Sequence, residues 1–297
     1  MFSLIKRAKR FKIDSSYGEF SCKEGETVLA AANRNGVYIP HQCTVGTCNS
    51  CSCKINGLDV LACRYKPQSD CQLKYQDETL FKTELIESSH IGESIYQVKI
   101  LLDDKHQYPI GSYINVYVDR HSKSSRKYSV VENGNSVVTI HVKRHKYGVI
   151  SNPLTSMNSG DVLYISEASG NYILPSNNRS YESCYGFANG SAFGVTASIV
   201  SDFLTENTDS NATLIALSRN KETNLYYEKV SKKIMDKHSN RIKIITKDFE
   251  EVLNQIDNSC PSNSMIFVCG SNDINKAFNL RKDNIESNKS ILIQESF

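Results

Sequence analysis

Six of the ten cysteines in this 297-residue chain lie in the short stretch between His41 and Cys71. Clustered thiols can form disulfides, bind zinc or hold an iron–sulfur cluster. Cys43, Cys48 and Cys51 have the spacing C-x4-C-x2-C, which is typical of plant-type 2Fe–2S centres that take a fourth cysteine from later in the chain. A zinc site would more naturally have two C-x2-C pairs, and only one is present. The spacing therefore favours an iron–sulfur cluster over zinc.

The fourth thiolate has three candidates, Cys53, Cys63 and Cys71. Cys53 lies on a predicted strand, where its side chain points away from its neighbour's face. Cys63 follows an apolar strand that can return to the cluster, and we choose it. The predicted ligand set is Cys43, Cys48, Cys51 and Cys63. Because a free cysteine is commonly a small buried hydrophobe, the following are treated as structural: Cys22, Cys53, Cys71, Cys184 and Cys260.

The elements around this loop predict a small domain over residues 1–76. The runs RFKID and GEFSCKE are typical of two strands joined by a turn that contains Gly18. The stretch GETVLAAANRNG has apolar residues on one helical face and ends at Gly36. Since the cysteine-rich loop follows directly, we expect a small sheet crossed by one helix to carry it.

Two further segments have different patterns of apolar and polar residues. Over residues 79–175, short β-branched or aromatic runs such as YQVKILL and SVVTIHVKR alternate with turn residues, which predicts an antiparallel barrel with one short helix in GVISNPLTSM. Over residues 180–297, buried strands such as TLIALS and SMIFVCG alternate with helical stretches, the last of them INKAFNLRKD, which predicts a parallel α/β sheet. The fold class expected is a multidomain combination of α+β and α/β.

The predicted barrel contains residues that suit a flavin. Arg126, Tyr128 and Ser129 form an R-x-Y-S motif. The arginine can pair with pyrophosphate, the tyrosine ring can lie against the isoalloxazine, and the hydroxyl can reach the flavin's reactive nitrogen. Such a motif alone is more often an ordinary strand. It gains weight from a predicted helix start further along, where backbone N–H groups can hold phosphate. The residues of this second motif are Gly148, Val149, Ile150 and Ser151.

The stretch PHQCTVGTCNSCSCKINGLDVLACRYKPQSD resembles the ferredoxin domain of iron–sulfur flavoprotein reductases, and the barrel motifs resemble those of the ferredoxin–NADP reductase superfamily. The resemblance implies a β-grasp ferredoxin domain, an FAD-binding barrel and an NAD(P)-binding α/β domain, in this order. It favours FAD over FMN, and it suggests that Phe297 covers the flavin ring, with a disordered end as the alternative. Two features depart from the family. Only eleven residues separate Cys51 from Cys63, and Asn49 replaces a glycine.

The turn that the family uses for the nicotinamide nucleotide is degenerate in the stretch GSAFGVTASIV. Aligned without a gap, Gly190, Ser191 and Ser198 match the family pattern, while Ala192 replaces its second glycine. A shift by two residues matches 194–196 instead. We expect cofactor contacts at Gly190 and Ser191, and leave both alignments open.

Two further elements bear on the nicotinamide. IFVCGSNDINKAF resembles the family's V-C-G-P element, which implies a catalytic position for Cys269 near the flavin and a cofactor contact at Gly270. The alternative for Cys269 is a buried thiol at the end of a core strand. Ser218, Arg219 and Lys221 follow the second strand of this segment, where a basic residue can bind a 2′-phosphate. A solvated turn is the alternative there.

The composition limits the partners. A net charge of +3 is too small to argue for nucleic acid. No apolar run is long enough to span a membrane, and the basic first residues lack the apolar core of a signal peptide. We therefore expect a cytoplasmic protein, and a monomer. Residues 1–75 carry eleven Lys or Arg against six Asp or Glu, which indicates either a solvated face or a docking surface for an acidic partner.

The three segments together resemble the reductases that serve multicomponent oxygenases and those that serve deoxysugar-forming iron–sulfur dehydratases. The function implied is electron transfer from NAD(P)H through FAD and a 2Fe–2S cluster to an external acceptor protein. A flavin and iron–sulfur electron carrier that binds no nicotinamide is the alternative, because the nucleotide turn is degenerate. A zinc-bound scaffold without either cofactor is a third possibility.

Overall fold

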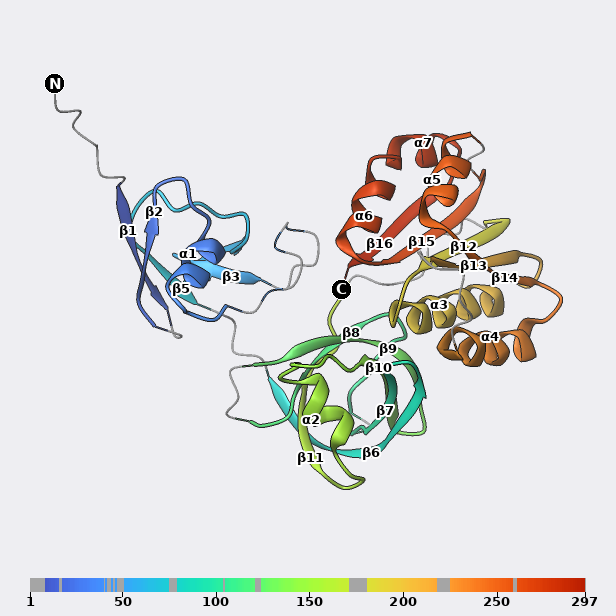
Figure 1. Cartoon of the computed structure of the whole chain (residues 1–297), viewed down its shortest axis with the longest axis horizontal. Helices are drawn as coiled ribbons and strands as arrows, with labels where there is room; N and C mark the ends of the chain where they lie inside the picture. Colours follow the sequence, from blue (N-terminus) through green and yellow to red (C-terminus); the bar gives the residue numbers. More distant parts are fainter. Residues whose placement is uncertain are drawn as a thin grey trace. The chain divides into compact units, whose positions relative to one another are not determined.

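A computed structural model describes residues 9–15, 18–39, 41, 44, 46, 51–74, 79–103, 105–120, 124–170, 181–217, 225–258 and 261–296. The chain divides into two compact units, Met1–Glu78 and Thr79–Phe297. Each unit is described by itself (Figure 1).

The first unit is a five-stranded mixed sheet with one helix packed on it. Its strands lie in the order β2-β1-β5-β3-β4, with β1 and β5 parallel and the other neighbours antiparallel. Helix α1 begins after Thr27, whose hydroxyl accepts a hydrogen bond from the backbone N–H of Ala30, and its apolar face joins the core of the unit. This confirms the predicted sheet crossed by a helix. The elements are β1 (Arg10–Ser15), β2 (Phe20–Lys23), α1 (Val28–Arg34), β3 (Ser52–Ile55), β4 (Leu58–Leu61) and β5 (Cys71–Lys74).

The second unit begins with a closed antiparallel barrel, as predicted. The strand order is β10-β7-β6-β11-β8-β9, and the inward side chains form one apolar core. The longest strand, β6, was not among the predicted runs. The predicted short helix is α2 (Ser151–Ser156). The strands are β6 (Leu80–Gly92), β7 (Ile95–Leu101), β8 (Tyr113–Tyr117), β9 (Arg126–Gly134), β10 (Val137–Lys143) and β11 (Val162–Ser166).

The same unit ends in a parallel sheet with the strand order β14-β13-β12-β15-β16, as predicted. Two helices, α3 and α4, cover the face of the sheet that meets the barrel, and three others cover the opposite face (Figure 1). The strands are β12 (Ser183–Ala188), β13 (Asn211–Leu217), β14 (Ile242–Lys247), β15 (Ser264–Gly270) and β16 (Ile291–Ser296). The helices are α3 (Ala192–Glu206), α4 (Leu225–His238), α5 (Phe249–Asn258), α6 (Asn272–Asn279) and α7 (Lys282–Ser287).

One predicted helix is in fact two. The stretch INKAFNLRKD was expected to be continuous, but α6 ends at Asn279 and α7 begins at Lys282. Between them, Leu280 is 85% exposed. The Arg281 guanidinium turns back to the carboxylate of Asp257, donating to it at 2.7 and 2.6 Å. The break lets the chain change direction at the surface while each short helix keeps its own apolar contact.

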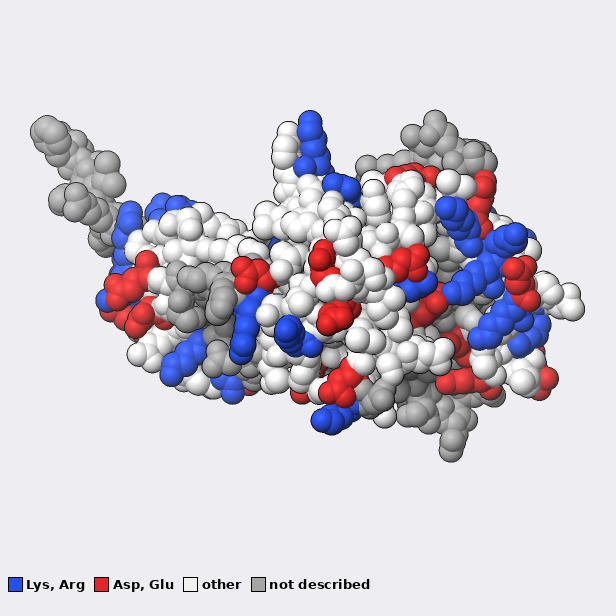
Figure 2. Space-filling view, turned by 90° about the horizontal axis from the view of Figure 1, so that it is seen from below, with Lys and Arg blue, Asp and Glu red and all other residues white. Residues whose placement is uncertain are grey.

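The surface carries both charge signs. Figure 2 shows Lys and Arg side chains interspersed with Asp and Glu over the face in view, as expected for a small net charge. Within the described part of the chain, no helix is both long and apolar enough to cross a membrane.

Candidate cofactor sites

Cys51 and Cys63 lie in direct contact in the first unit. The backbone N–H of Cys63 donates to the Sγ of Cys51 at 3.4 Å, and the N–H of Ala62 donates to the carbonyl of Cys51 at 2.9 Å. Backbone N–H groups that point at ligand sulfurs are a usual means of tuning an iron–sulfur centre. Two of the four predicted ligands are therefore neighbours. The other two, Cys43 and Cys48, lie outside the described residues.

A tight hairpin explains why only eleven residues separate these two cysteines. Strands β3 and β4 are joined by Asn56 and Gly57, which have φ values of 49° and 87°. An Asn-Gly pair with positive φ at both positions is the preferred two-residue hairpin turn. Because Ser52 pairs with Leu61 in this hairpin, the residues on either side of the pair, Cys51 and Ala62–Cys63, meet again. The short link is thus a direct return of the chain to the ligand loop.

The ligand loop itself approaches Cys63 at Gly46. This glycine has a φ of +85°, and a Cβ there would lie 2.9 Å from the Cγ of Arg64. Only glycine fits both the conformation and the contact. The contact places Gly46, which lies between the predicted ligands Cys43 and Cys48 in the sequence, beside Arg64, the residue after Cys63. This geometry fits a group held by four thiolates from the two segments.

The other cysteines of the first unit lie in its core. Cys22 is fully buried, and its pKa is raised to about 11, mainly by burial. Cys53 and Cys71 are 4% and 7% exposed and belong to the same apolar cluster. Cys53 lies on β3 opposite Val60, and Cys71 lies on β5 opposite Ile13. Their places are those of packed apolar side chains, so the choice of Cys63 as the fourth ligand stays our prediction.

The R-x-Y-S motif begins strand β9 of the barrel. Ser129 is buried opposite Tyr113 on β8, and Tyr128 is opposite Ile114. Burial raises the pKa of the Tyr128 hydroxyl, so the ring carries no charge at neutral pH. The ammonium of Lys127 lies over the Tyr113 ring, 4.0 Å from its centroid. One edge of the barrel therefore presents aromatic rings, a cation and a hydroxyl, all of which suit a flavin.

The second flavin motif surrounds the start of α2. A Cβ at Gly148 would collide with the Oγ of Ser151, so a larger residue there requires the serine side chain to move. No side chain caps the helix start. In the next residue, the Nδ2 of Asn152 donates to the carbonyl of Lys146 at 3.1 Å, while its Oδ1 is buried without a hydrogen-bond partner. An uncapped helix start and a buried, orphaned acceptor fit a ligand with phosphates and hydroxyl donors, as FAD has.

The predicted nicotinamide residues meet at one edge of the parallel sheet. In the order β14-β13-β12-β15-β16, successive strands are added on one side of β12 as far as β14 and then on its other side from β15. The topological switch point therefore lies between the parallel strands β12 and β15, where Ala188 pairs with Cys269. Ligands of open α/β sheets bind beyond the carboxyl ends of the strands at such a point. Gly270 is the last residue of β15, and Gly190 lies two residues after the end of β12. A Cβ at Gly270 would collide with Asn189, so the two loops are in contact.

The start of helix α3 separates the residues that the two possible alignments of the nucleotide turn use. Gly190 has a φ of +57° and forms the turn, and Ser191 precedes the first helical residue. Gly194 lies inside α3, where a Cβ would collide with the His141 ring. Gly190 and Ser191 thus lie before the helix and Gly194 lies within it, and the alignment without a gap stays our prediction.

This turn already has protein partners. The backbone N–H of Gly190 donates to the hydroxyl of Tyr227 at 2.8 Å, and the hydroxyl of Tyr226 donates to the carbonyl of Ser191 at 3.1 Å. Nothing in the sequence pattern of the turn indicated these contacts. A backbone N–H that a nucleotide phosphate could use is thus bound to a tyrosine at the start of α4.

Cys269 and a carboxylate lie together at the end of the sheet. Cys269 is fully buried, its side chain interacts with Thr196, and burial raises its thiol pKa well above the usual value. Its partner on β16 is Glu295, whose pKa burial raises to about 7, against the lowering effect of Lys127. Sequence reasoning missed Glu295, which pairs with Cys269 and whose pKa is influenced by Lys127 of the flavin motif. Its place two residues before Phe297 was the only available signal.

Several predicted residues cannot be placed. Ser218, Arg219, Lys221 and Phe297 lie outside the described residues. Their roles in nucleotide selection and flavin cover stay predictions.

Comparison with known proteins agrees with this geometry. Residues 11–78 match the family described as a 2Fe-2S iron-sulfur cluster binding domain, and residues 82–173 match the family described as an oxidoreductase FAD-binding domain. The first match contains the Cys51–Cys63 contact, and the second contains both flavin motifs.

Relatives and solved structures extend over more of the chain. The phenol hydroxylase P5 protein of Acinetobacter pittii (strain PHEA-2) is 24% identical over 73% of this chain and 70% of its own length. The reductase component 1 of terephthalate 1,2-dioxygenase from Comamonas sp. is 23% identical over 68% of each chain. A ferredoxin reductase in carbazole 1,9a-dioxygenase has the same fold, with a TM-score of 0.64 at 16% identity over 98% of this chain and 99% of its own. A cytochrome P450 reductase from Amycolatopsis has a TM-score of 0.62 at 18% identity, over 97% of this chain and 99% of its own.

An iron–sulfur domain and a flavin domain thus follow each other on one chain, and a parallel sheet with the geometry of a nucleotide-binding edge comes after them. The protein is an iron–sulfur flavoprotein oxidoreductase, with a 2Fe-2S cluster binding domain followed by an oxidoreductase FAD-binding domain.

Proposed function

We propose that this oxidoreductase is the NAD(P)H-dependent reductase component of an oxygenase system, which passes electrons to a separate acceptor protein. The observation that carries the proposal is that the charge of Lys127, within the flavin motif, acts on the carboxylate of Glu295 at the edge of the parallel sheet. Lys127 of the flavin motif acts on the carboxylate of Glu295, and Glu295 pairs with Cys269 at the carboxyl edge of the sheet. This electrostatic link supports a flavin and a nicotinamide that bind next to each other.

The acceptor is inferred from the relatives. One relative is named as the P5 protein of phenol hydroxylase, and another is named as the reductase component 1 of terephthalate 1,2-dioxygenase. An oxygenase component is accordingly the acceptor that we propose, ahead of an iron–sulfur dehydratase. We also propose the division into domains of residues 1–76, 79–175 and 180–297, and a cytoplasmic location in which clustered thiols stay reduced.

Each group of residues has a positioning task in this function. Gly148 to Ser151 would bind the FAD pyrophosphate, together with Arg126. Tyr128 and Ser129 would orient the isoalloxazine ring. When bound, FAD allows a two-electron donor to supply an acceptor that takes single electrons. Gly190 and Gly270 let backbone approach a nucleotide, and Cys269 lies buried beneath that position. Cys43, Cys48, Cys51 and Cys63 would hold the cluster.

A second function is favoured by one specific contact. The Gly190 N–H is bound to Tyr227, and Ala192 stands where the family has its second glycine. If nicotinamide binding is lost for this reason, the chain is an electron carrier that another protein reduces. The hydrogen bond is a single exchangeable contact worth about 1 kcal/mol, which a nucleotide phosphate can replace. We therefore rank the reductase first.

Anaerobic titration separates the two functions. The purified protein is mixed with NADH or NADPH, and the flavin and iron–sulfur absorbance is followed. If the protein is the reductase, at least one of NADH and NADPH should bleach its flavin and iron–sulfur absorbance. Full bleaching by dithionite with none by either nicotinamide would establish the electron carrier instead. A colourless protein that contains zinc would exclude both.

A further inference from the structure

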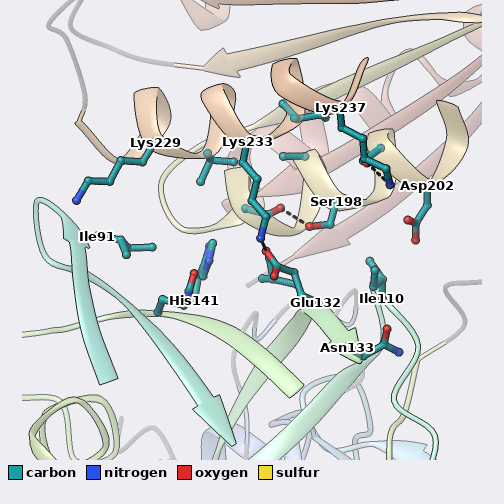
Figure 3. Close-up of a pocket in the computed structure, with 17 residues that line it drawn as sticks. Ile91, Ile110, Glu132, Asn133, His141, Ser198, Asp202, Lys229, Lys233 and Lys237 are labelled. Atoms are coloured by element: carbon teal, nitrogen blue, oxygen red, sulfur yellow. Dashed lines mark hydrogen bonds and ion pairs between the residues drawn. The ribbon is translucent and has the colours of Figure 1, made fainter. Parts of the chain in front are cut away.

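A cavity of about 370 Å³ lies between the barrel and helices α3 and α4 (Figure 3). Its volume is in the range of small-molecule sites. It shares no residue with the flavin motifs at 126–129 and 148–151. It also lies apart from the Gly190–Ser191 turn, along the sides of the two helices. The function proposed above therefore makes no use of it.

The cavity has an apolar interior built by both halves of the unit. Ile91, Ile110 and Val131 come from the barrel, and Val230 and Ile234 come from α4. The barrel and helix side chains face each other across the space in Figure 3. Since these apolar side chains leave a gap instead of closing on one another, an apolar body can enter without displacing them.

A row of cations borders the cavity on α4. Lys229, Lys233 and Lys237 are spaced by four residues and lie on the same face of the helix. Lys233 forms an ion pair with Glu132 of β9, and Lys237 donates to the Oγ of Ser201 at 3.4 Å. Among the described residues, Lys229 has no hydrogen-bond or ion-pair partner. One positive charge at the border is thus available to a ligand.

The base of the cavity cannot supply a second cation. The Tyr226 hydroxyl donates its one proton to the carbonyl of Ser191, so at the 2.9 Å contact with His141 it must accept from Nδ1–H. Burial, together with nearby Lys233, lowers the pKa of His141 to about 4, so the ring is neutral. In this tautomer Nε2 is an acceptor, which repels a carboxylate. An anionic head is therefore favoured only at the lysine border.

We propose that this cavity is a binding site for a small amphipathic monocarboxylate, with its apolar body between the barrel and α4 and its carboxylate at Lys229. Such a ligand would connect β9 and β10 to α4, the helix whose first residues hold the nucleotide turn. Its binding would stabilise the contact between the barrel and the parallel sheet. The site is independent of the oxygenase assignment.

Calorimetric titration of the full-length holoprotein tests this with three probes of equal chain length: octanoate, octanol and octylamine. Octanoate should bind saturably at one site and raise the melting temperature. Octanol, which lacks the charge, should bind about tenfold more weakly, and octylamine should not bind. Equal binding of octanoate and octanol, or no saturable binding of octanoate, would overturn the proposal.

Three variants locate the binding. Lys229→Ala should weaken octanoate binding about tenfold, whereas Lys232→Ala, which removes the same charge from α4 outside the cavity lining, should leave it unchanged. Val230→Phe fills the apolar interior and should abolish binding while the flavin content is kept. Equal effects of the two lysine variants, or undiminished binding by Val230→Phe, would place octanoate elsewhere and contradict the proposal. Reductase activity is not part of the readout, so failure of the proposed function would leave this test intact.

Discussion

The backbone N–H of Cys63 donates a hydrogen bond to the Sγ of Cys51 at 3.4 Å. This contact joins two cysteines that are separated by eleven residues, through the Asn56–Gly57 hairpin. It distinguishes Cys63 from the nearby Cys53, which lies on β3 opposite Val60. A cluster ligand and a core thiol are therefore separable by substitution.

Cys63→Ser should remove most of the bound iron and the visible iron–sulfur absorbance, while the flavin stays bound, because the flavin motifs lie in the other compact unit. Cys53→Ala is the matched control. It should keep the cluster and cost only the stability of a small cavity, about 1 kcal/mol. Iron analysis and visible circular dichroism measure both. Retention of the cluster in Cys63→Ser with its loss in Cys53→Ala would reverse the assignment.

Gly148→Ala should lower the FAD content several-fold, because the new Cβ collides with the Oγ of Ser151 and displaces the start of α2. The double variant Gly148→Ala with Ser151→Ala removes the colliding atom. It should recover part of the flavin content if the effect is steric. Flavin released on denaturation is quantified by absorbance. A double variant no better than the single one would show that the glycine serves another purpose.

The spacing of the cysteines predicted an iron–sulfur domain because ligand spacing is a local property, and residues 11–78 match a 2Fe-2S iron-sulfur cluster binding domain. The parallel sheet was equally predictable, since strands such as β15 are buried along their whole length. The barrel strand β6 was missed for the opposite reason. Among its thirteen residues only Leu85 and Gly92 are buried, and two register shifts interrupt its pairing with β7. Its residues alternate little between buried and exposed positions, and its pairing with β7 and β11 holds it in place.

The contacts that complete the sites are long-range and had no local signal. Tyr227 reaches Gly190 from the start of α4, and His141 reaches Tyr226 from the barrel. The pKa of Glu295 is raised by burial and lowered by Lys127, which comes from a strand far away in the sequence. Sequence patterns report which face of an element is buried, and they do not report which distant side chain will meet it.

Tyr227→Phe should lower the KM for the nicotinamide about fivefold with little change in kcat. The reason is that the Gly190 N–H is then unbound before the nucleotide arrives, which saves a hydrogen bond worth about 1 kcal/mol. Tyr226→Phe is the comparison. It breaks the contacts with His141 and the Ser191 carbonyl and should disturb the turn, raising KM instead. A higher KM in Tyr227→Phe would mean that the tyrosine supports the nucleotide.

Electron delivery to the acceptor protein should slow several-fold as salt is raised, if the basic surface of residues 1–75 docks an acidic partner. Reduction of the flavin by the nicotinamide, measured in the same buffers by stopped flow, controls for general salt effects. An acceptor reaction independent of ionic strength would favour a solvated face without a docking role.

Glu295→Gln should change how stability depends on pH. The folded protein raises the pKa of this carboxyl from its ordinary value to about 7. Folding therefore favours the protonated form, and the stability that it contributes is complete at low pH and lost as pH rises through about 7. Glutamine mimics the neutral carboxyl. The melting temperature of the variant should equal that of the wild type at pH 5 and should be about 2–4 °C higher at pH 8. Glu286→Gln, on the surface helix α7, controls for the loss of one negative charge. Thermal unfolding followed by circular dichroism across this range measures the difference, and a gap that is largest at pH 5 would mean that the folded state favours the ionised carboxylate.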